Sequence, residues 1–305
     1  MERTILKGAT GLNNKVSAER LSYDQRTGIT ELAAAVNVDI DDSYAISRRL
    51  GITQLSDKVY HSLFCDGGDC FIVEDRTDDA AIMKVATDYS LTGVRSSLTK
   101  GARISFWQVG DKTFYSSLYQ NGVIESGVSS PWPTQDHVGV DTTRNFSAAP
   151  PGKHIAVFLG RMWIVVGSVI WVSEPYAFGK FDVSRRFFQF GDNVVMIKPV
   201  ENGVWVSTSR EIGFIGRAET FEAMSYVKKA SFPAHEYSAN IALIDLSSTN
   251  LQIPGLSAIW SSDQGICIGT ENGQLVIPTE RDLIYSTGSS GATVVKDKVL
   301  INTVY

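Results

Sequence analysis

Short apolar runs, separated by polar and glycine-containing turns, dominate the hydrophobic pattern of this chain. Valine, isoleucine and aromatic residues fill the runs, and pairs such as Asn-Gly and Asp-Gly separate them, which is typical of β-hairpins. Helical periodicity is almost absent. The best candidate is a single short helix over residues 29–36, where Thr30 could act as the cap. The pattern therefore predicts an all-β protein.

The apolar runs recur as a strand–turn–strand unit. Its copies start at Val59, Arg103, His154, Val194, Leu256 and Thr293. This spacing is comparable with the roughly 40–50 residues of a four-stranded propeller blade. One small sheet cannot bury both of its faces, whereas sheets stacked around an axis bury each other. We therefore expect a β-propeller of about five or six small antiparallel blades. A pair of β-sandwich domains is the alternative.

The same pattern predicts how the chain is divided. Residues 1–36 are polar and are expected to form an N-terminal arm that a neighbouring protein orders. Residues 37–305 are expected to form one propeller domain, with insertions at about 134–152 and 217–254. The last repeat is short, and the predicted hairpin at 35–47 is expected to complete it and close the ring.

Composition narrows the class of protein. The chain has 305 residues, is 43% hydrophobic and carries a net charge of −5, which argues against a surface that grips nucleic acid all over. Three cysteines do not make a disulfide framework in so long a chain, so we expect a reduced, cytosolic folding environment. No signal peptide is visible at the start. Residues 155–172 approach the length of a membrane span, but Arg161 and the glycines at 160 and 167 divide them into strand-sized pieces.

The sequence contains no catalytic signature. Nucleotide-binding loops and nucleophile elbows are absent, and the four histidines show no metal-ligand spacing. His61 and His154 lie at the heads of predicted strands and are expected to be structural. The acidic run at 38–43 lacks the glycine and glutamate of a calcium loop and is expected to be a hairpin turn. Residues 261–265 partly match the Asp-box, a structural hairpin tip in sialidase-type propellers. We expect a protein that is not an enzyme and uses neither a metal nor a cofactor.

Two groups of polar residues are candidates for binding. Three basic doublets could contact DNA phosphates or a protein partner: Arg48, Arg49, Arg185, Arg186, Lys228 and Lys229. A glycan-binding or glycan-cleaving propeller would instead need paired carboxylates at the mouth of a blade. The first candidates for that role lie in the predicted long loops: Asp136, Asp141 and Glu236.

Several segments, taken in order, resemble a family of tailed-bacteriophage structural proteins. The N-terminal run 6–21 is followed by the hairpin Ala-Val-Asn-Val-Asp-Ile-Asp-Asp at 35–42 and by Ile-Ser-Arg-Arg-Leu-Gly-Ile at 46–52. Later matches are the strand sets at 160–175, 203–216 and 265–276. The chain departs from the family at Leu50, where proline is common. Each motif is ordinary β-sequence, and the ordered combination carries the resemblance.

The family is similar to the tail-hub, or DNA-stabilisation, proteins at the head–tail junction of short-tailed phages. The resemblance implies a propeller-like virion protein in a homo-oligomeric ring, a hexamer, that closes or continues the DNA channel used in DNA ejection. It implies portal or adaptor ring proteins, tail or tail-fibre proteins and packaged DNA, bound without sequence specificity, as partners, and no membrane. The protein would be made in the host cytoplasm and located in the virion. The alternative function is a glycan-binding or receptor-binding β-propeller. A receptor-binding tail protein would be located at the distal tip.

Overall fold

The computed structural model describes most of the chain. It covers residues 8–36, 38–41, 43–48, 53–66, 68–134, 144–243, 255–278, 283, 288, 290–296 and 299–304. For residues 292–304 only the backbone is described. Within these ranges the structure is all-β, as the hydrophobic pattern predicts, apart from two single-turn 3-10 helices, η1 (Ala18–Arg20) and η2 (Phe221–Ala223).

Most of the strands belong to five antiparallel sheets, which we call blades 1 to 5. Blade 1 contains β6 (Val59–Asp66), β7 (Asp69–Asp75), β8 (Ala80–Val85) and β9 (Leu91–Leu98). Blade 2 contains β10 (Ser105–Val109), β11 (Lys112–Ser116), β12 (Asn121–Glu125) and β13 (Val128–Ser130). Blade 3 contains β15 (His154–Phe158), β16 (Arg161–Val166), β17 (Val169–Glu174) and β18 (Ala177–Asp182), with β14 (Phe146–Ser147) and β19 (Phe187–Gln189) added at its edges.

The remaining two blades follow in the same style. Blade 4 contains β20 (Val194–Val200), β21 (Gly203–Thr208), β22 (Ile212–Gly216) and β23 (Tyr226–Ala230). Blade 5 contains β24 (Asn240–Leu243), β25 (Leu256–Ser262), β26 (Gly265–Gly269) and β27 (Leu275–Val276). In every blade the main strands pair in chain order, and tight turns join most of them.

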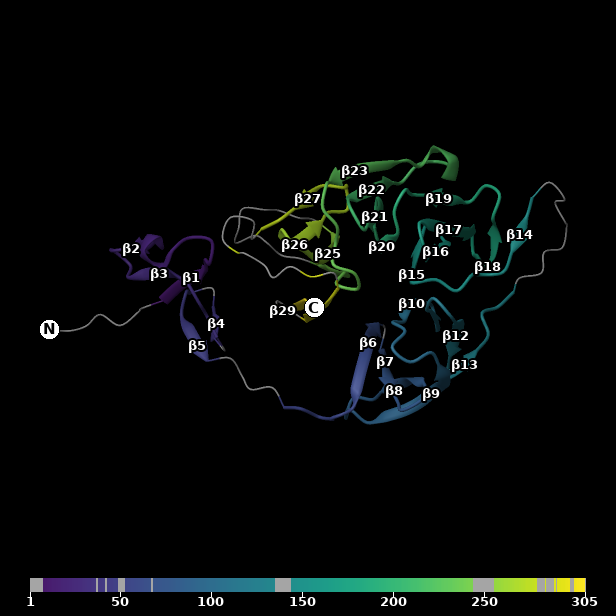
Figure 1. Ribbon diagram of the computed structural model, residues 1–305, viewed down its shortest axis with the longest axis horizontal. Coiled ribbons are helices and arrows are strands. Elements are labelled where there is room, and N and C mark those ends of the chain that lie inside the picture. The colour runs from purple at the N-terminus through teal and green to yellow at the C-terminus, as the bar shows by residue number, and fades with distance from the viewer. Residues whose placement is uncertain are drawn as a thin grey trace.

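The blades are arranged as in a propeller. Figure 1 shows them following one another around a common centre, with β6, β10, β15 and β20 on the inside. Consecutive first strands are in contact, since β10 lies against β6 and β15, and β20 lies against β15 and β24. The C-terminal hairpin of β28 (Gly291–Lys296) and β29 (Val299–Val304) contacts blade 5. This is the propeller-like architecture expected from the repeats.

The apolar cores lie between blades. Four clusters of buried side chains join blades 1 and 2, 2 and 3, 3 and 4, and 4 and 5. Between blades 4 and 5, Trp205 is fully buried, packs 5.4 Å from the ring of Trp260 and donates an indole hydrogen bond of 3.0 Å to the Thr270 carbonyl. Gly269 is required there, because a Cβ atom would overlap the Trp205 indole. Each sheet is thus stabilised chiefly by its neighbours.

Buried serines connect one blade to the next. Ser116 Oγ on β11 accepts a 2.9 Å hydrogen bond from the backbone N–H of Gly152, just before blade 3. Ser207 Oγ on β21 accepts one of the same length from Ala234, just before blade 5. These bonds satisfy buried backbone donors in the connecting segments, which would otherwise cost about 1–3 kcal/mol each. The connections between blades are therefore fixed at equivalent points.

The first part of the chain forms a separate small unit, which we call the N-terminal unit. It contains β1 (Gly8–Leu12), β2 (Tyr23–Asp24) and β3 (Ile29–Leu32) in one sheet, and the hairpin of β4 (Val38–Ile40) and β5 (Ile46–Arg48). The predicted helix at 29–36 is wrong, because Ile29 and Thr30 are β-branched and β3 pairs with both β1 and β2. The described part of the predicted arm is thus a small sheet.

The hairpin at 35–47 does not complete the last repeat. Among the residues that the structure describes, β4 and β5 pair only with each other. Their turn packs on β1, where the backbone N–H of Ala9 donates a 2.9 Å hydrogen bond to the Tyr44 carbonyl. The prediction that the acidic run is a turn is confirmed, since Asp41 Oδ1 accepts bonds from the backbone of Ser43 and Ala45. The N-terminal strands therefore lie to one side of the blades in Figure 1.

Other expectations meet the structure as follows. Residues 155–172 form β15, β16 and most of β17, and no helix in the described ranges is long and apolar enough to cross a membrane. Residues 217–243, expected to be part of an insertion, supply η2, β23 and β24.

The expectation of reduced thiols fails at the β6–β7 hairpin, where Cys65 and Cys70 face each other and form a disulfide. Cys267 is free and buried, and burial raises its pKa to about 12.

The packing between blades leads to the first prediction. We expect Trp205→Ala to lower the free energy of unfolding by about 3–5 kcal/mol, because it opens a cavity between blades 4 and 5. Tyr119→Ala, at a residue 61% exposed, serves as the control and should change it by less than about 0.5 kcal/mol. Urea denaturation followed by tryptophan-independent circular dichroism measures both. A loss below about 1 kcal/mol for Trp205→Ala would contradict packing between the blades as the main support.

Candidate functional site

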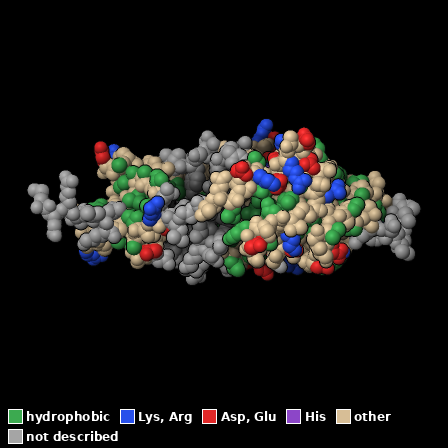
Figure 2. Space-filling model, turned by 90° about the horizontal axis from the view of Figure 1, so that it is seen from below, with side chains coloured by type: hydrophobic (Ala, Val, Ile, Leu, Met, Phe, Trp, Pro, Cys, Tyr) green, Lys and Arg blue, Asp and Glu red, His purple; other side chains and the backbone are tan. Residues whose placement is uncertain are grey.

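The basic doublets do not converge on one site. Arg48 lies on β5 of the N-terminal unit, and Arg49 lies outside the described residues. Arg185 and Arg186 belong to the turn between β18 and β19. Lys228 and Lys229 lie on β23, the outer strand of blade 4. In Figure 2, lysine and arginine side chains are interspersed with aspartate and glutamate over the described part of this face.

Two of the basic side chains already have acidic partners. Arg186 forms ion pairs with Glu222 and, at 3.8 Å, with Glu174, and its guanidinium lies 5.1 Å from the centre of the Phe221 ring. Lys228 Nζ lies 2.8 Å from Glu211 Oε2, a contact that lowers the pKa of the glutamate. Arg186 and Lys228 therefore have primarily structural roles, because acidic side chains already hold them in place.

The proposed pair of carboxylates cannot be assembled from described residues. Asp136 and Asp141 lie outside them. Glu236 precedes β24, and its side chain is 15% exposed, with its Oε1 atom 2.5 Å from Lys153 Nζ. Burial alone would raise the pKa of Glu236, but the contacts with His154 and Lys153 outweigh it and the pKa is lowered. A carboxylate held ionised in this way is a counter-ion, unlike the protonated acid that glycoside hydrolysis requires.

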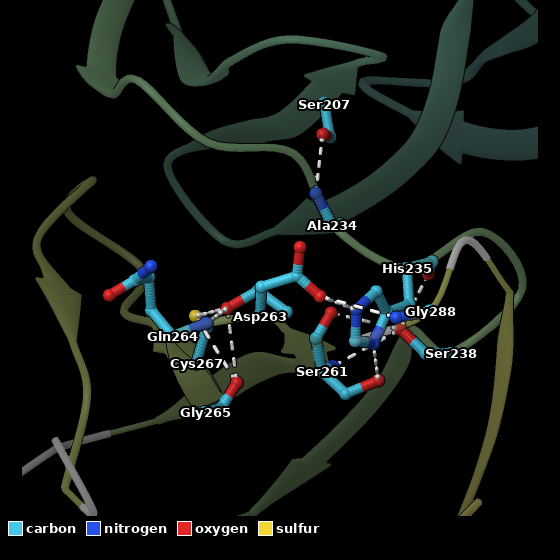
Figure 3. Close-up of polar contacts among 11 residues, drawn as sticks. Ser207, Ala234, His235, Ser238, Ser261, Asp263, Gln264, Gly265, Cys267 and Gly288 are labelled. Atoms are coloured by element: carbon cyan, nitrogen blue, oxygen red, sulfur yellow. Dashed lines mark hydrogen bonds and ion pairs between the residues drawn. The ribbon is translucent and has the colours of Figure 1, made fainter. Parts of the chain in front are cut away.

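A serine, a histidine and an aspartate meet at the start of blade 5. Figure 3 shows the His235 ring between Ser261 and Asp263, with Nδ1 3.1 Å from Ser261 Oγ and Nε2 2.9 Å from Asp263 Oδ1. Ser238 Oγ donates a 2.6 Å bond to the His235 carbonyl and accepts one of 3.1 Å from the Ser261 backbone. The network fastens residues 235–238, which lead into β24, to the neighbouring strand β25.

This arrangement is not a catalytic triad. In a hydrolytic triad the serine bonds the Nε2 atom and the carboxylate bonds Nδ1, whereas here the two are exchanged. Ser261 is also fully buried, so its hydroxyl cannot reach a substrate. The Asp-box-like segment 261–265 behaves as expected from the sequence. It forms the tip between β25 and β26, where Ser262 Oγ bonds the backbone of Gln264 and Gly265.

A second polar group lies at the inner strands, and we call it the axial cluster. Its members are Arg103, Lys153, His154, Lys198, Glu236 and Tyr237. Arg103 precedes β10, Lys153 precedes β15, which begins at His154, and Lys198 lies within β20. Glu236 and Tyr237 precede β24. Four consecutive blades thus each contribute from the first strand or from the residues just before it, and Figure 1 shows β10, β15 and β20 on the inside.

Direct contacts join the members of the axial cluster other than Lys198, whose charge acts on His154. Lys153 Nζ meets Glu236 at 2.5 Å, and His154 Nε2 lies 3.6 Å from the same carboxylate oxygen. The rings of His154 and Tyr237 are 5.0 Å apart. Arg103 and Lys153 approach the Tyr237 ring at 5.9 and 5.8 Å, within the range of cation–π attraction.

The electrostatics of the cluster reflect its burial. Burial lowers the pKa of Lys198 to about 8, because the ammonium loses hydration. Burial also lowers the pKa of His154, against the opposing effect of Glu236 and with further lowering by the charges of Lys198 and Lys153. His154 is therefore neutral at pH 7, and the cluster contains three cationic side chains and one anionic side chain.

The sequence pattern contains a signal for this cluster that the search for motifs missed. In blades 2 and 3 a basic residue directly precedes or begins the apolar first strand, as Arg103 and Lys153 do. Equivalent positions in successive repeats come together at the axis of a propeller. Within the described residues, no group of three or more histidine, cysteine, aspartate or glutamate side chains could hold a metal ion.

Comparisons with known proteins give structural likeness alone. No family model and no curated protein matches the chain. Among solved structures, it is similar to the extracellular domain of a one-component system from B. thetaiotaomicron (9% identity, 82% of this chain and 32% of that chain, TM-score 0.48). A protein from Lactobacillus plantarum is also similar (12% identity, 78% of this chain and 75% of that chain, TM-score 0.45). So is the computationally designed Ika8 protein (12% identity, 82% of this chain and 69% of that chain, TM-score 0.43). At these scores none of them carries a functional argument, and the resemblance to phage proteins stays a prediction.

The burial of Lys198 leads to a prediction on pH dependence. Its pKa of about 8, against an ordinary 10.5, means that above pH 8 the unfolded chain binds a proton that the folded chain releases. The side chain therefore contributes a rise in the free energy of unfolding between pH 8 and 10, by at most about 1.4 kcal/mol per pH unit. Lys198→Met should flatten this rise, whereas Lys229→Met, at an exposed lysine, should keep the wild-type slope. Equal slopes for all three proteins in urea denaturation would show that Lys198 is solvated.

Proposed function

We propose that the chain is a non-enzymatic structural protein of tailed-phage particles, a subunit of a homo-oligomeric ring at the head–tail junction or tail hub. The observation that carries the assembly role is the N-terminal unit, which lies to one side of the blades and buries almost no apolar side chain. The ordered motifs described for the sequence support the phage particle as its location.

The N-terminal unit lacks a core of its own. Its buried residues in the described ranges are Gly8, Ala9, Asn13 and Gly28, none of which has a large apolar side chain. Its exposed apolar residues include Val16, Tyr23, Val36 and Tyr44. Hydrophobic side chains are visible on this part of the surface at the left of Figure 2. Sheets this small need further packing to be stable in water, which a neighbouring subunit would supply.

A closed ring of subunits would pack every N-terminal unit against a neighbouring subunit and would leave no unpaired docking surface. If the N-terminal unit of one subunit docks on the blades of the next, the contact is head-to-tail, and a repeated head-to-tail contact closes into a ring when the rotation fits. The proposed ring is the hexamer implied by the resemblance, with portal or adaptor proteins and tail or tail-fibre proteins on its two faces. The blades would act as the rigid body of each subunit.

The later family-like segments each fall on two neighbouring strands of one blade. Residues 160–175 span β16 and β17, residues 203–216 span β21 and β22, and residues 265–276 span β26 and β27. Each segment thus supplies the second and third strands of a blade or its third and fourth. This regular placement supports a resemblance based on repeated blades.

The charge distribution is compatible with DNA passing nearby without being read. The net charge is −5, and basic and acidic side chains alternate on the face in Figure 2. Because Arg186 and Lys228 have acidic partners, the exposed side chains of Arg48, Arg185 and Lys229 are the proposed phosphate contacts. Such contacts would be independent of DNA sequence.

A ligand-binding propeller at the distal tail tip is the second candidate. The axial cluster favours it, because charged side chains gathered at the inner strands are suited to holding a ligand. Its position in the particle distinguishes it from the first candidate.

Electron microscopy of purified particles of the phage that encodes this chain tests the location. We expect density for a ring of this chain between capsid and tail, labelled by an antibody against the blades. Density at the distal tip would support receptor binding instead. Particles without the chain would overturn both phage functions.

The assembly role can be tested on the isolated chain. We expect a ring-sized species in analytical ultracentrifugation, and we expect Tyr23→Glu with Val36→Glu to convert it to monomer, since both side chains are more than half exposed in one subunit. Leu118→Glu, a similar exposed apolar-to-acid change on blade 2, is the control and should leave the ring intact. An unchanged oligomer in the double variant, or a wild-type chain that stays monomeric at high concentration, would contradict the docking role of the N-terminal unit.

A further inference from the structure

We propose that the axial cluster is a binding site for a small oxyanion, a carboxylate or phosphate group carried by a compact ligand. The inference is independent of where the chain acts, because it concerns the interior of a single subunit. It rests on a lysine without a counter-charge among the described residues, a buried ring nitrogen that makes no hydrogen bond there, and a backbone held in an unfavourable conformation.

One cation of the cluster has no counter-charge among the described residues. Glu236, the acidic member, is ion-paired with Lys153 at 2.5 Å, and Arg103 has interactions of its own. Among the described residues Lys198 has no carboxylate within ion-pair distance. A half-buried ammonium without a counter-charge is unfavourable, and a bound anion would compensate it.

A ring nitrogen of His154 is also available. The residue is only 9% exposed, and its Nε2 atom makes no hydrogen bond within the described structure, because the Glu236 oxygen at 3.6 Å lies beyond hydrogen-bond distance. Buried polar atoms in native proteins almost always have partners, so an isolated one indicates a missing partner. An oxygen of a ligand held by Lys198 and Lys153 would supply it, with the Nε2 atom carrying the proton.

The backbone conformation of Tyr237 also supports a binding site at the axial cluster. Its φ is +64°, in the left-handed region that non-glycine residues rarely adopt. Such strain persists where the surroundings fix it, and here Ser238, His235 and Ser261 fasten the segment on either side of Tyr237. The Tyr237 ring is thereby held beside His154, Arg103 and Lys153 before any ligand arrives.

These features define the ligand by its chemistry. Several donors from separate blades converge, which suits an oxyanion with oxygens in more than one direction. The face of Tyr237 can pack against an apolar or ring-shaped body attached to the anion. Phosphate esters and sugar acids both meet this description, and neutral sugars do not.

Isothermal titration of the full chain with inorganic phosphate and, separately, with glucuronate tests the proposal at constant ionic strength. Glucose is the neutral control. We expect saturable binding of at least one anion and none of glucose. Lys198→Met should weaken that binding at least about 10-fold, whereas Lys100→Met, which removes an exposed lysine between β9 and β10, should bind like the wild type. If only phosphate binds, the ligand is a phosphate ester. If only glucuronate binds, the ligand is a sugar acid.

Arg103→Gln is a second variant, in case Lys198→Met does not give the wild-type circular dichroism spectrum, and it should also weaken binding at least about 10-fold. No saturable binding of either anion by the wild-type chain would overturn the proposal. Equal affinities for the wild-type chain and a folded Lys198→Met or Arg103→Gln variant would overturn it as well. The measurement uses the isolated chain, so its outcome is separate from that of the particle-location experiment.

Discussion

Apolar packing between neighbouring sheets is the constraint on which the rest of this structure depends. Each blade has two apolar faces and cannot bury them alone, so the four clusters between blades act as one continuous support. Trp163, Trp205 and Trp260 are fully buried in three successive blades and provide the largest apolar surfaces. The N-terminal unit lies outside this series and has no comparable core. This contrast is the reason for the proposal that the N-terminal unit packs on a neighbouring subunit.

The same packing creates the axial cluster. When sheets stack around a centre, the residues that lead into their first strands meet there, although they are distant in sequence. Lys153 and Glu236 are 83 residues apart and touch because they precede the first strands of blades 3 and 5. The serine bonds and the His235 network fix these connecting segments, so the polar groups keep their positions. A fold maintained by apolar contacts thereby positions a charged site in its interior.

Hydrophobic alternation and turn residues were sufficient to predict the class of fold. Glycines at 160 and 167 correctly divided an apolar stretch into β15, β16 and β17. Prediction failed where local propensity and tertiary contacts differ. Residues 29–32 pair with β1, which periodicity cannot show, and the polar strand β23 was assigned to an insertion because only its blade context makes it a strand. The axial cluster was missed because the basic residue before the first strand recurs only in blades 2 and 3, whereas Lys198 lies inside β20. Only the three-dimensional repeat brings them together.

Native-state hydrogen exchange of the full chain, resolved by mass spectrometry, tests the central claim most directly. If packing between blades is the main support, the inner and middle strands of blades 1 to 5 should exchange together, with protection close to the global free energy of unfolding. At concentrations too low for assembly, β1–β5 should exchange much faster. Blades that open one at a time, or an N-terminal unit as well protected as the blades in the monomer, would contradict the account.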